Sequence, residues 1–285
     1  MKAVIPAAGM GTRFLPATKN MPKEMLPLVD KPVIQFVVEE AVAAGFDDIL
    51  IVTGRSKRAI EDHFDRALEL EHALEARGDE KLLREVRRVA ELGNIHYVRQ
   101  SEPLGLGHAV LCARKHIGNE PFALLLGDDV VVAKTPCSRQ LWSAHVETGG
   151  SVVAVGRTPR EQLGRYGVVD VASTVRPGLH AARGLVEKPK PEDAPSDLAV
   201  MGRYLLTPDV FDVLEKQAPG RGGEIQLTDA LHALAGQGRV AALEFEGRRF
   251  DLGTRMEWLK TNIEVALSMP DMGPELRAFL DAVRK

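Results

Sequence analysis

Short apolar runs alternate with amphipathic helical segments along the first part of this chain, and few architectures accommodate that order. Residues 32–45 carry apolar side chains at positions 33, 34, 37, 38, 41 and 42, which is the i, i+3, i+4 stripe of a half-buried helix. Strands separated by such helices are typical of a parallel sheet with helical crossovers. The expected strands are 3–5, 49–53, 95–98, 122–126 and 151–156.

The second part of the chain changes toward paired extended runs, which predict antiparallel additions to the same sheet. These runs lie at 167–171, 184–187 and 200–206, and helices are expected at 138–147, 208–217, 227–238 and 255–267. No linker, repeat or low-complexity tract divides the chain. We therefore expect one elaborated α/β domain over residues 1–285, with a mixed, mainly parallel central sheet flanked by helices.

Residues 56–93 consist almost entirely of good helix formers with interspersed charges of both signs. One or two solvated helices inserted into the fold explain this pattern, because helices laced with opposite charges are stable in water. An acidic or basic binding surface is the alternative interpretation of the same residues.

The overall charge argues against a polyanionic partner. The chain has 37 Lys and Arg against 40 Asp and Glu, a formal net charge of −3, so neither nucleic acid nor an anionic membrane surface is expected. The first apolar run is shorter than that of a signal peptide, and no run approaches the roughly 18 residues of a membrane span. These observations predict a cytoplasmic protein.

A glycine-opened loop follows the first expected strand, where backbone N–H groups can converge on a phosphate. Gly9 and Gly11 open this loop. A dinucleotide fingerprint would need a third glycine at the position of Phe14, and a P-loop would need a Gly-Lys pair where Gly11 is followed by Thr12 and Arg13. Both nicotinamide cofactors and an ordinary NTPase site therefore lose support.

Three cations make the same loop strongly basic. Arg13, Lys19 and Lys23 lie within eleven residues, and the prolines of the loop stiffen it and reduce the ordering cost of binding. Solvated cations around a simple glycine turn are the structural alternative. Charge and stiffness together favour a polyphosphate ligand.

Carboxylates end two of the expected strands. Asp128 and Asp129 follow an apolar run at the carboxyl edge, where open parallel sheets place their ligands, and Asp251 precedes Gly253 in a second strand end of the same style. Mg²⁺ uses one or two carboxylates together with substrate phosphates. Asp128 and Asp251 are therefore candidates for a shared metal, although aspartates also cap turns at strand ends.

Glu187 and Lys188 lie between an apolar run and a proline-rich segment. A lysine suits a phosphate monoester as a point charge, and a glutamate accepts hydrogen bonds from sugar hydroxyls. Successive side chains of a strand point to opposite sides, so both residues face one pocket only if the strand is irregular. An exposed salt bridge is the alternative.

Six segments taken together resemble the bacterial UTP–glucose-1-phosphate uridylyltransferases, within the wider sugar-1-phosphate nucleotidyltransferase family. They are PAAGMGTRFLPATKNMPKEMLP, EPLGLGHAV, LLLGDD, GLVEKPKPEDAPSDLAVMGRYLLTP, GEIQLTDAL and FDLG. The resemblance implies a Rossmann-like sheet of the nucleotide-diphospho-sugar transferase type. It further implies a nucleotide-binding part over about 1–130, a sugar-phosphate-binding part over about 131–267 and C-terminal helices over about 254–285.

The resemblance also implies roles for matching residues. Ala8, Gly9, Gln100 and Gly105 would hold uracil; Gly11, Thr12, Arg13 and Lys23 the triphosphate; Gly167, Glu187 and Gly202 the glucose ring; Lys188 the sugar phosphate; and Asp128 and Asp251 Mg²⁺. Arg13, Lys23, Asp128 and Lys188 are the residues expected to carry the chemistry.

The activity implied is conversion of UTP and α-D-glucose 1-phosphate to UDP-glucose and pyrophosphate, with Mg²⁺ as cofactor and a homodimer or homotetramer as the assembly. A related enzyme with another base or sugar, and a regulator that binds nucleotide sugars without catalysis, are the alternatives. The chain departs from the family pattern after Asp251, where Glu257 and Trp258 stand in place of a glycine-tyrosine pair. That departure bears on the start and packing of the helix that follows.

Overall fold

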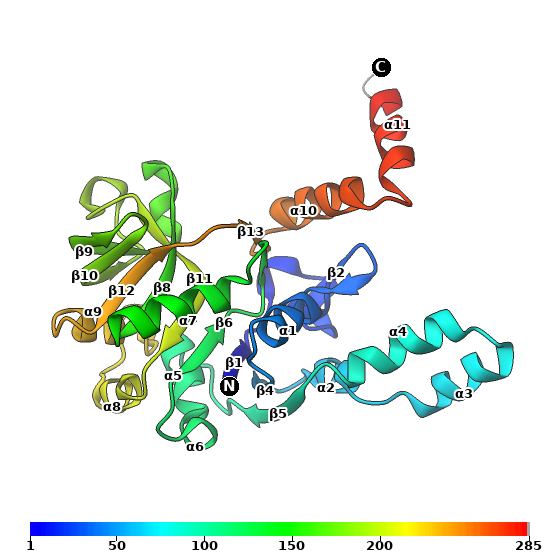
Figure 1. Ribbon diagram of the computed structural model, residues 1–285, viewed down its shortest axis with the longest axis horizontal. Helices are drawn as coiled ribbons and strands as arrows, with labels where there is room; N and C mark the ends of the chain where they lie inside the picture. Colours follow the sequence, from blue (N-terminus) through cyan, green and yellow to red (C-terminus); the bar gives the residue numbers. More distant parts are fainter. Residues whose placement is uncertain (284–285) are drawn as a thin grey trace.

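The computed structural model describes residues 1–283, which form a nine-stranded sheet with helices on both faces (Figure 1). One side of the sheet comes from the first part of the chain. It contains, in spatial order, β5 (Asn94–Arg99), β4 (Asp48–Thr53), β1 (Lys2–Ala7) and β6 (Phe122–Leu125). Each is parallel to its neighbour, as the alternation of strands and helices predicts.

The other side of the sheet is built mainly from antiparallel neighbours. In spatial order it contains β11 (Leu198–Leu206), β8 (Ser151–Arg157), β12 (Val240–Glu244), β10 (Leu179–Glu187) and β9 (Gly167–Arg176). β8 and β12 are parallel, and the other adjacent pairs are antiparallel. The mixed sheet is thus confirmed, with parallel strands predominating only in the first part. Sequence analysis does not predict β12, whose sequence VAALE is rich in alanine.

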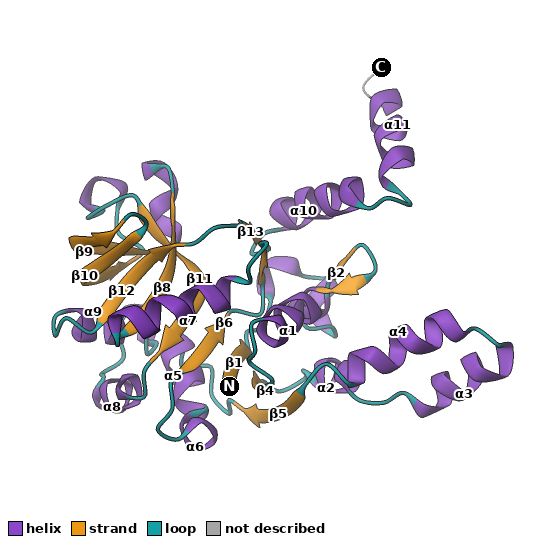
Figure 2. Cartoon of the chain, viewed as in Figure 1, coloured by secondary structure: helices purple, strands orange, loops and turns teal. Residues whose placement is uncertain are grey.

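Two helical layers cover the sheet (Figure 2). α1 (Val33–Ala43) and α7 (Cys137–Thr148) pack in one buried cluster with β1 residues such as Ile5. α5 (Leu106–Cys112), α8 (Asp209–Lys216) and α9 (Leu227–Ala235) pack on the opposite face in a cluster with Val4. Ile5 and Val4 point to opposite faces because side chains alternate along a strand.

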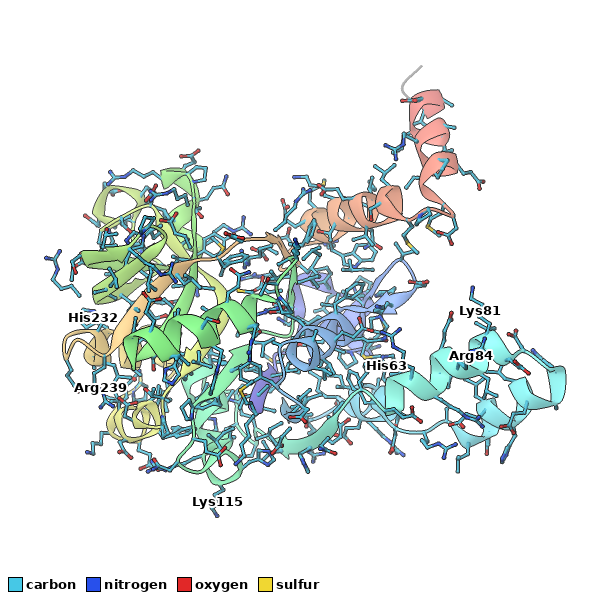
Figure 3. All side chains as sticks on the ribbon, viewed as in Figure 1. His63, Lys81, Arg84, Lys115, His232 and Arg239 are labelled. Atoms are coloured by element: carbon cyan, nitrogen blue, oxygen red, sulfur yellow. The ribbon has the colours of Figure 1, made fainter. Side chains whose placement is uncertain are left out.

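The charged block at 56–93 forms helices, as predicted. α2 (Arg58–Phe64) lies near the body, and α3 (Leu68–Arg77) and α4 (Glu80–Ala90) form a hairpin that projects from it (Figure 1). Lys81 and Arg84 on α4 point away from the molecule (Figure 3). The hairpin is thus mostly solvated, in agreement with its charge pattern.

The C-terminal part crosses back over the sheet before it leaves the body. β13 (Arg248–Asp251) pairs with β7 (Asp129–Val132), and α10 (Arg255–Ser268) and α11 (Gly273–Val283) then form an arm that extends outward (Figure 1). The remaining short elements are β2 (Pro27–Leu28), β3 (Lys31–Pro32) and α6 (Arg114–Ile117). Within residues 1–283, no helix is both long and apolar enough to cross a membrane.

Candidate active site

Two adjoining cavities open beyond the carboxyl ends of the parallel strands. The first has a volume of about 360 Å³ and the second about 580 Å³. Leu106, Leu126, Asp128 and Glu224 line both cavities, so the two spaces meet at these side chains. An extended ligand with two parts fits this shape better than a single compact one.

The glycine loop forms one wall of the first cavity. Gly11 has a left-handed φ of 65°, and a β-carbon there would lie 3.3 Å from the Lys23 side chain. The Thr18 hydroxyl donates to the Gly11 carbonyl oxygen at 2.7 Å, which holds the loop folded back on itself. This fold brings Lys23 against Gly9, where a β-carbon would lie 3.7 Å from its Cε.

The residues expected to hold a base lie together in the first cavity. Ala8 and Gly9 come from the end of β1, and Gln100 and Gly105 lie across the cavity after β5. Gln100 Nε2 donates to the Gly105 carbonyl oxygen at 3.1 Å and lies 3.0 Å from His108 Nδ1. The side-chain amide is therefore fixed in orientation by the protein.

The predicted triphosphate residues divide between the cavities. Lys23 lines the first and Arg13 the second, where the Arg13 guanidinium lies 3.4 Å from the Gly253 carbonyl oxygen. Gly11 and Thr12 belong to the same loop, but neither is among the described residues that line the two cavities. Of the four residues predicted for the triphosphate, the structure thus brings Arg13 and Lys23 to the cavities but not Gly11 or Thr12.

Lys23 and Asp128 form an ion pair in which Nζ lies 2.5 Å from Oδ2. Burial, the largest effect, disfavours the charge on Lys23, but Asp128, Glu24 and Asp129 together outweigh it and raise the Lys23 pKa. Burial is also the largest effect on Asp128, where it acts against the ionised form, but Lys23, a backbone hydrogen bond and Arg249 together outweigh it and lower the Asp128 pKa. Both groups are therefore charged at neutral pH, and each compensates the other.

Asp129 is more deeply buried than Asp128 and contacts Arg249, whose NH2 lies 2.6 Å from Oδ1. Burial raises the pKa of Asp129 to about 7, against the opposing effect of Arg249. Gly202 on β11 has a φ of 66°, and a β-carbon there would lie only 2.1 Å from Asp129 Oδ2. Glycine at 202 is thus required for Asp129 to lie where it does.

The pairing of β13 with β7 brings the two strand-end carboxylates into one cavity. Asp251 lies opposite Asp129 in the register, and the Leu252 backbone N–H donates to the Asp128 carbonyl oxygen at 3.2 Å. Asp128 and Asp251 both line the second cavity, as sequence analysis predicts. Asp251 Oδ2 accepts a hydrogen bond from the Tyr166 hydroxyl at 2.9 Å.

Glu187 and Lys188 both line the second cavity, because the backbone is irregular at their junction. Lys188 has a φ of 47°, in the left-handed region that breaks strand alternation. Lys188 Nζ lies 2.9 Å from Glu187 Oε1, and the Thr228 hydroxyl donates to Glu187 Oε2 at 2.6 Å. Gly167 lies opposite Glu187 on β9 and completes this wall.

A buried arginine supports the loop that carries Asp128. Arg203 on β11 is fully buried, and its Nε donates to Glu40 Oε2 at 2.9 Å. Its NH2 donates to the Asp129 carbonyl oxygen at 2.7 Å, and its NH1 to that of Leu126 at 3.3 Å. The guanidinium thus binds the loop on both sides of Asp128, at Leu126 and at Asp129, and Glu40 neutralises the positive charge of Arg203.

Several residues that line the second cavity are not predicted as site residues from the sequence. Arg249 could have been found, because it stands two residues before Asp251 and therefore points to the same side of β13. Thr228 lies in the first turn of α9, and nothing in the local sequence indicates that its hydroxyl donates to Glu187. Arg165 pairs with Asp251 at 3.1 Å, and nothing in its local sequence indicates this contact.

The departure after Asp251 leaves the start of α10 intact. Thr254 caps the helix, its side-chain oxygen accepting from the Glu257 backbone N–H at 3.3 Å. Trp258 Nε1 donates to the Pro27 carbonyl oxygen at 3.1 Å, which packs the helix against β2. The residues that replace the glycine-tyrosine pair therefore supply contacts of their own.

The donor chemistry of Asp128 and Asp251 fits a hard divalent cation. Both offer carboxylate oxygens to one cavity, and Mg²⁺ binds through one or two carboxylates while keeping waters and substrate phosphates as its other ligands. In this structure each carboxylate pairs with a cation, Asp128 with Lys23 and Asp251 with Arg165, and a divalent ion would compete with these partners.

Comparison with known proteins identifies the sequence relatives. The profile of the Nucleotidyl transferase family matches residues 2–266. UTP–glucose-1-phosphate uridylyltransferase of Staphylococcus epidermidis is 55% identical over 98% of this chain and 96% of its own.

Solved structures are similar over nearly the same range. A UTP-bound UGPase from Acinetobacter baumannii is 40% identical, covers 98% of both chains and has a TM-score of 0.90. A UDP-glucose pyrophosphorylase in complex with UDP-glucose is 43% identical, covers 93% of this chain and 97% of its own, and has a TM-score of 0.84. The fold therefore has relatives that were solved with bound UTP and with bound UDP-glucose.

Proposed function

This chain belongs to the nucleotidyl transferase family, and from that membership we propose that it is an enzyme that converts UTP and α-D-glucose 1-phosphate to UDP-glucose and pyrophosphate. The observation that carries the proposal is the junction of the two cavities at Asp128. A base-sized space on one side and a space lined by Glu187 and Lys188 on the other would accommodate two substrates end to end.

The proposed binding mode follows from what each wall offers. Uracil lies among Ala8, Gly9, Gln100 and Gly105, where the fixed amide of Gln100 and backbone groups read its polar edge. The glucose ring lies along Gly167, Glu187 and Gly202, with the Glu187 carboxylate accepting from sugar hydroxyls. A β-carbon at Gly167 would lie 3.5 Å from Glu187 Oε2, so glycine at this position leaves room for the ring beside that carboxylate.

Charge compensation is the main task of the protein residues. The sugar phosphate and the triphosphate are both anions, and two unit charges about 4 Å apart at an effective dielectric near 20 repel by roughly 4 kcal/mol. Lys188 binds the sugar phosphate, and Arg13 and Lys23 bind the triphosphate from the loop. The negative charge of the attacking phosphate and that of the leaving pyrophosphate are therefore each neutralised by their own cations.

The transfer is an in-line displacement at the α-phosphorus. An oxygen of the sugar phosphate forms the new P–O bond, the bond from the α-phosphorus to the bridging oxygen breaks, and its electron pair leaves with pyrophosphate. The attacking oxygen is already ionised at neutral pH, so alignment and electrostatic stabilisation are sufficient and no general base is required. Arg13 and Lys23 stabilise the charge that develops on the pyrophosphate.

Asp128 and Asp251 are the residues that would hold Mg²⁺, which when bound supplies further positive charge to the phosphate oxygens. Lys23 pairs with Asp128 in this structure, so binding the triphosphate through Lys23 would replace that contact. Lys23 therefore exchanges one anion for another when the nucleotide binds. A cytoplasmic location and a homodimer or homotetramer complete the proposal on the strength of the family resemblance.

The test is a pyrophosphate-release assay on purified protein with a panel of substrates. We expect release with UTP and glucose 1-phosphate, and much less with dTTP, CTP or other sugar phosphates. Faster release with another pair would assign the enzyme to a related reaction. No release from any pair, together with UDP-glucose binding by calorimetry, would favour the non-catalytic regulator.

A further inference from the structure

A second cluster of metal-ligating side chains lies at the opposite end of the parallel strands from the cavities. Among the described residues, Asp48, His96 and His116 form the group whose ligand atoms all lie within 4.8 Å of one another. Asp48 begins β4, whereas the cavities open beyond the far ends of β1 and β4. Six residues of strand separate the two ends, about 16 Å.

The sheet register places two of the three ligands side by side. His96 on β5 lies opposite Leu50 on β4, and Asp48 points to the same face as Leu50 because it precedes it by two residues. Asp48 and His96 are therefore diagonal neighbours on one face of adjacent strands. This relationship depends on the backbone pairing and not on a chosen rotamer.

The third ligand comes from the helical layer over that face. His116 belongs to α6, which lies beside β4, β5 and the N-terminus in Figure 1; the adjacent Lys115, labelled in Figure 3, points outward. Lys2 Nζ donates to the carbonyl oxygens of His116 at 3.0 Å and Ile117 at 3.1 Å, which anchors the end of α6. Three separate elements thus converge on this point.

The distances are close to those of a tetrahedral metal. Nε2 of His116 lies 2.7 Å, and Nε2 of His96 3.7 Å, from the same oxygen, Asp48 Oδ1. Ligand atoms about 2.0–2.1 Å from a tetrahedral ion are about 3.3 Å apart, between these two values. Movements of about half an ångström would bring both nitrogens to this separation, with a metal ion in place of the hydrogen bond between His116 and Asp48.

We propose that Asp48, His96 and His116 bind one Zn²⁺ or a similar first-row divalent ion, with water as the fourth ligand. Two imidazoles select this class over Mg²⁺, which prefers oxygen. The three side chains are partly exposed, with 33%, 53% and 24% of their surfaces accessible, so an ion can reach them. The bound ion would join β4, β5 and α6 and stabilise the fold without contacting the cavities.

The experiment uses the full chain, freed of metal by dialysis against chelator and then titrated with ZnCl2 by calorimetry in excess Mg²⁺. The excess Mg²⁺ occupies oxygen-only sites, so imidazole-dependent binding remains visible. Co²⁺ in place of Zn²⁺ gives visible absorption bands that report nitrogen and oxygen ligands. The variants are His96→Gln and His116→Gln, and the matched control is His72→Gln, an exposed histidine on α3.

We expect one equivalent of Zn²⁺ and a higher Tm for the wild type and His72→Gln. Loss of either ligand should weaken binding at least tenfold, since loss of even an outer partner costs 10–100-fold, while pyrophosphate release in Mg²⁺ stays unchanged. His96 is the more exposed ligand, so its variant keeps the test valid if His116→Gln folds poorly. Equal Zn²⁺ binding by wild type and His96→Gln, or none by either, would overturn the proposal.

Discussion

Lys23 Nζ lies 2.5 Å from Oδ2 of Asp128, so the ammonium group neutralises a carboxylate that the proposed mechanism assigns to Mg²⁺. Lys23→Met should therefore tighten Mg²⁺ binding to the nucleotide-free protein by at least about tenfold, because a nearby unit charge interacts by roughly 4 kcal/mol. The same variant should lose turnover. Lys19→Met, in the same loop and exposed, should do neither. Calorimetry with MgCl2 and the pyrophosphate assay measure both effects, and unchanged turnover in Lys23→Met would remove this lysine from the mechanism.

Lys188 provides the sharpest test of the sugar-phosphate side. Lys188→Ala should keep UTP affinity, raise the KM for glucose 1-phosphate and lower kcat, because the cation on the attacking phosphate is lost. Lys190→Ala is the matched control, two residues along the same segment and exposed. Steady-state kinetics with each substrate varied separates the effects. Equal kinetic changes in the two variants would indicate a general effect of charge and not a contact with substrate.

A substitution of Asp251 tests whether Asp128 and Asp251 bind the same Mg²⁺ ion. Asp251→Asn keeps an acceptor for the Tyr166 hydroxyl but removes the charge, so activity should fall and the Mg²⁺ concentration needed for half-maximal rate should rise. Asp62→Asn, with 66% of its side chain exposed on α2, is the control. Chelator should abolish activity in the wild type, and excess Mg²⁺ should restore it. A Mg²⁺ dependence identical to the wild type would show that Asp251 has another role.

Gly202 is expected to tolerate no side chain. Gly202→Ala combines a left-handed φ with a β-carbon 2.1 Å from Asp129 Oδ2, and each effect costs about 1–3 kcal/mol. Gly178→Ala shares the positive φ but meets no atom closer than 3.7 Å, so it isolates the backbone contribution. Urea unfolding should therefore show the larger loss of stability at 202. Equal losses would mean that Asp129 moves away without cost.

The α3–α4 hairpin should respond to acid through Glu71. This side chain is 1% exposed, and hydrogen bonds from Arg66 and Arg87 lower its pKa from near 4.5 to about 2. Because the folded pKa is the lower one, its stabilisation is present above pH 4.5 and is lost as the pH falls toward 2. Hydrogen exchange over 68–90 should thus accelerate in that window. Glu71→Gln should remove this pH dependence and the exposed Glu69→Gln should keep it; the reverse result would contradict the assignment.

Hydrophobic periodicity predicts much of this fold because it reports which faces are buried. The stripe at 32–45 becomes α1, and the apolar run at 49–53 becomes part of β4. The same reasoning does not find β12, because its sequence VAALE contains two alanines. Alanine has a low strand propensity and is as common in helices and loops. The burial of β12 comes from its neighbours β8 and β10, which only the assembled sheet supplies.

The candidate site shows the same division between local and long-range information. Asp128 is predictable because it follows β6, which ends at the same edge as the other parallel strands. The meeting of Asp251 with Asp128 depends instead on the antiparallel pairing of β13 with β7. The shared orientation of Glu187 and Lys188 is not predictable, because it depends on a φ of 47° at Lys188. Arg203 stands in an apolar strand, and nothing local reveals that it is wholly buried beneath the loop of Asp128.

The late position of β13 in the chain has a consequence for synthesis. Every strand of the nine-stranded sheet is complete by Glu244, but Asp251 is still to be translated. Every residue that lines the first cavity, the proposed uracil site, therefore precedes Asp251 in the chain. A stop codon at position 248 would, on this view, yield a protein that captures the nucleotide and releases it unreacted.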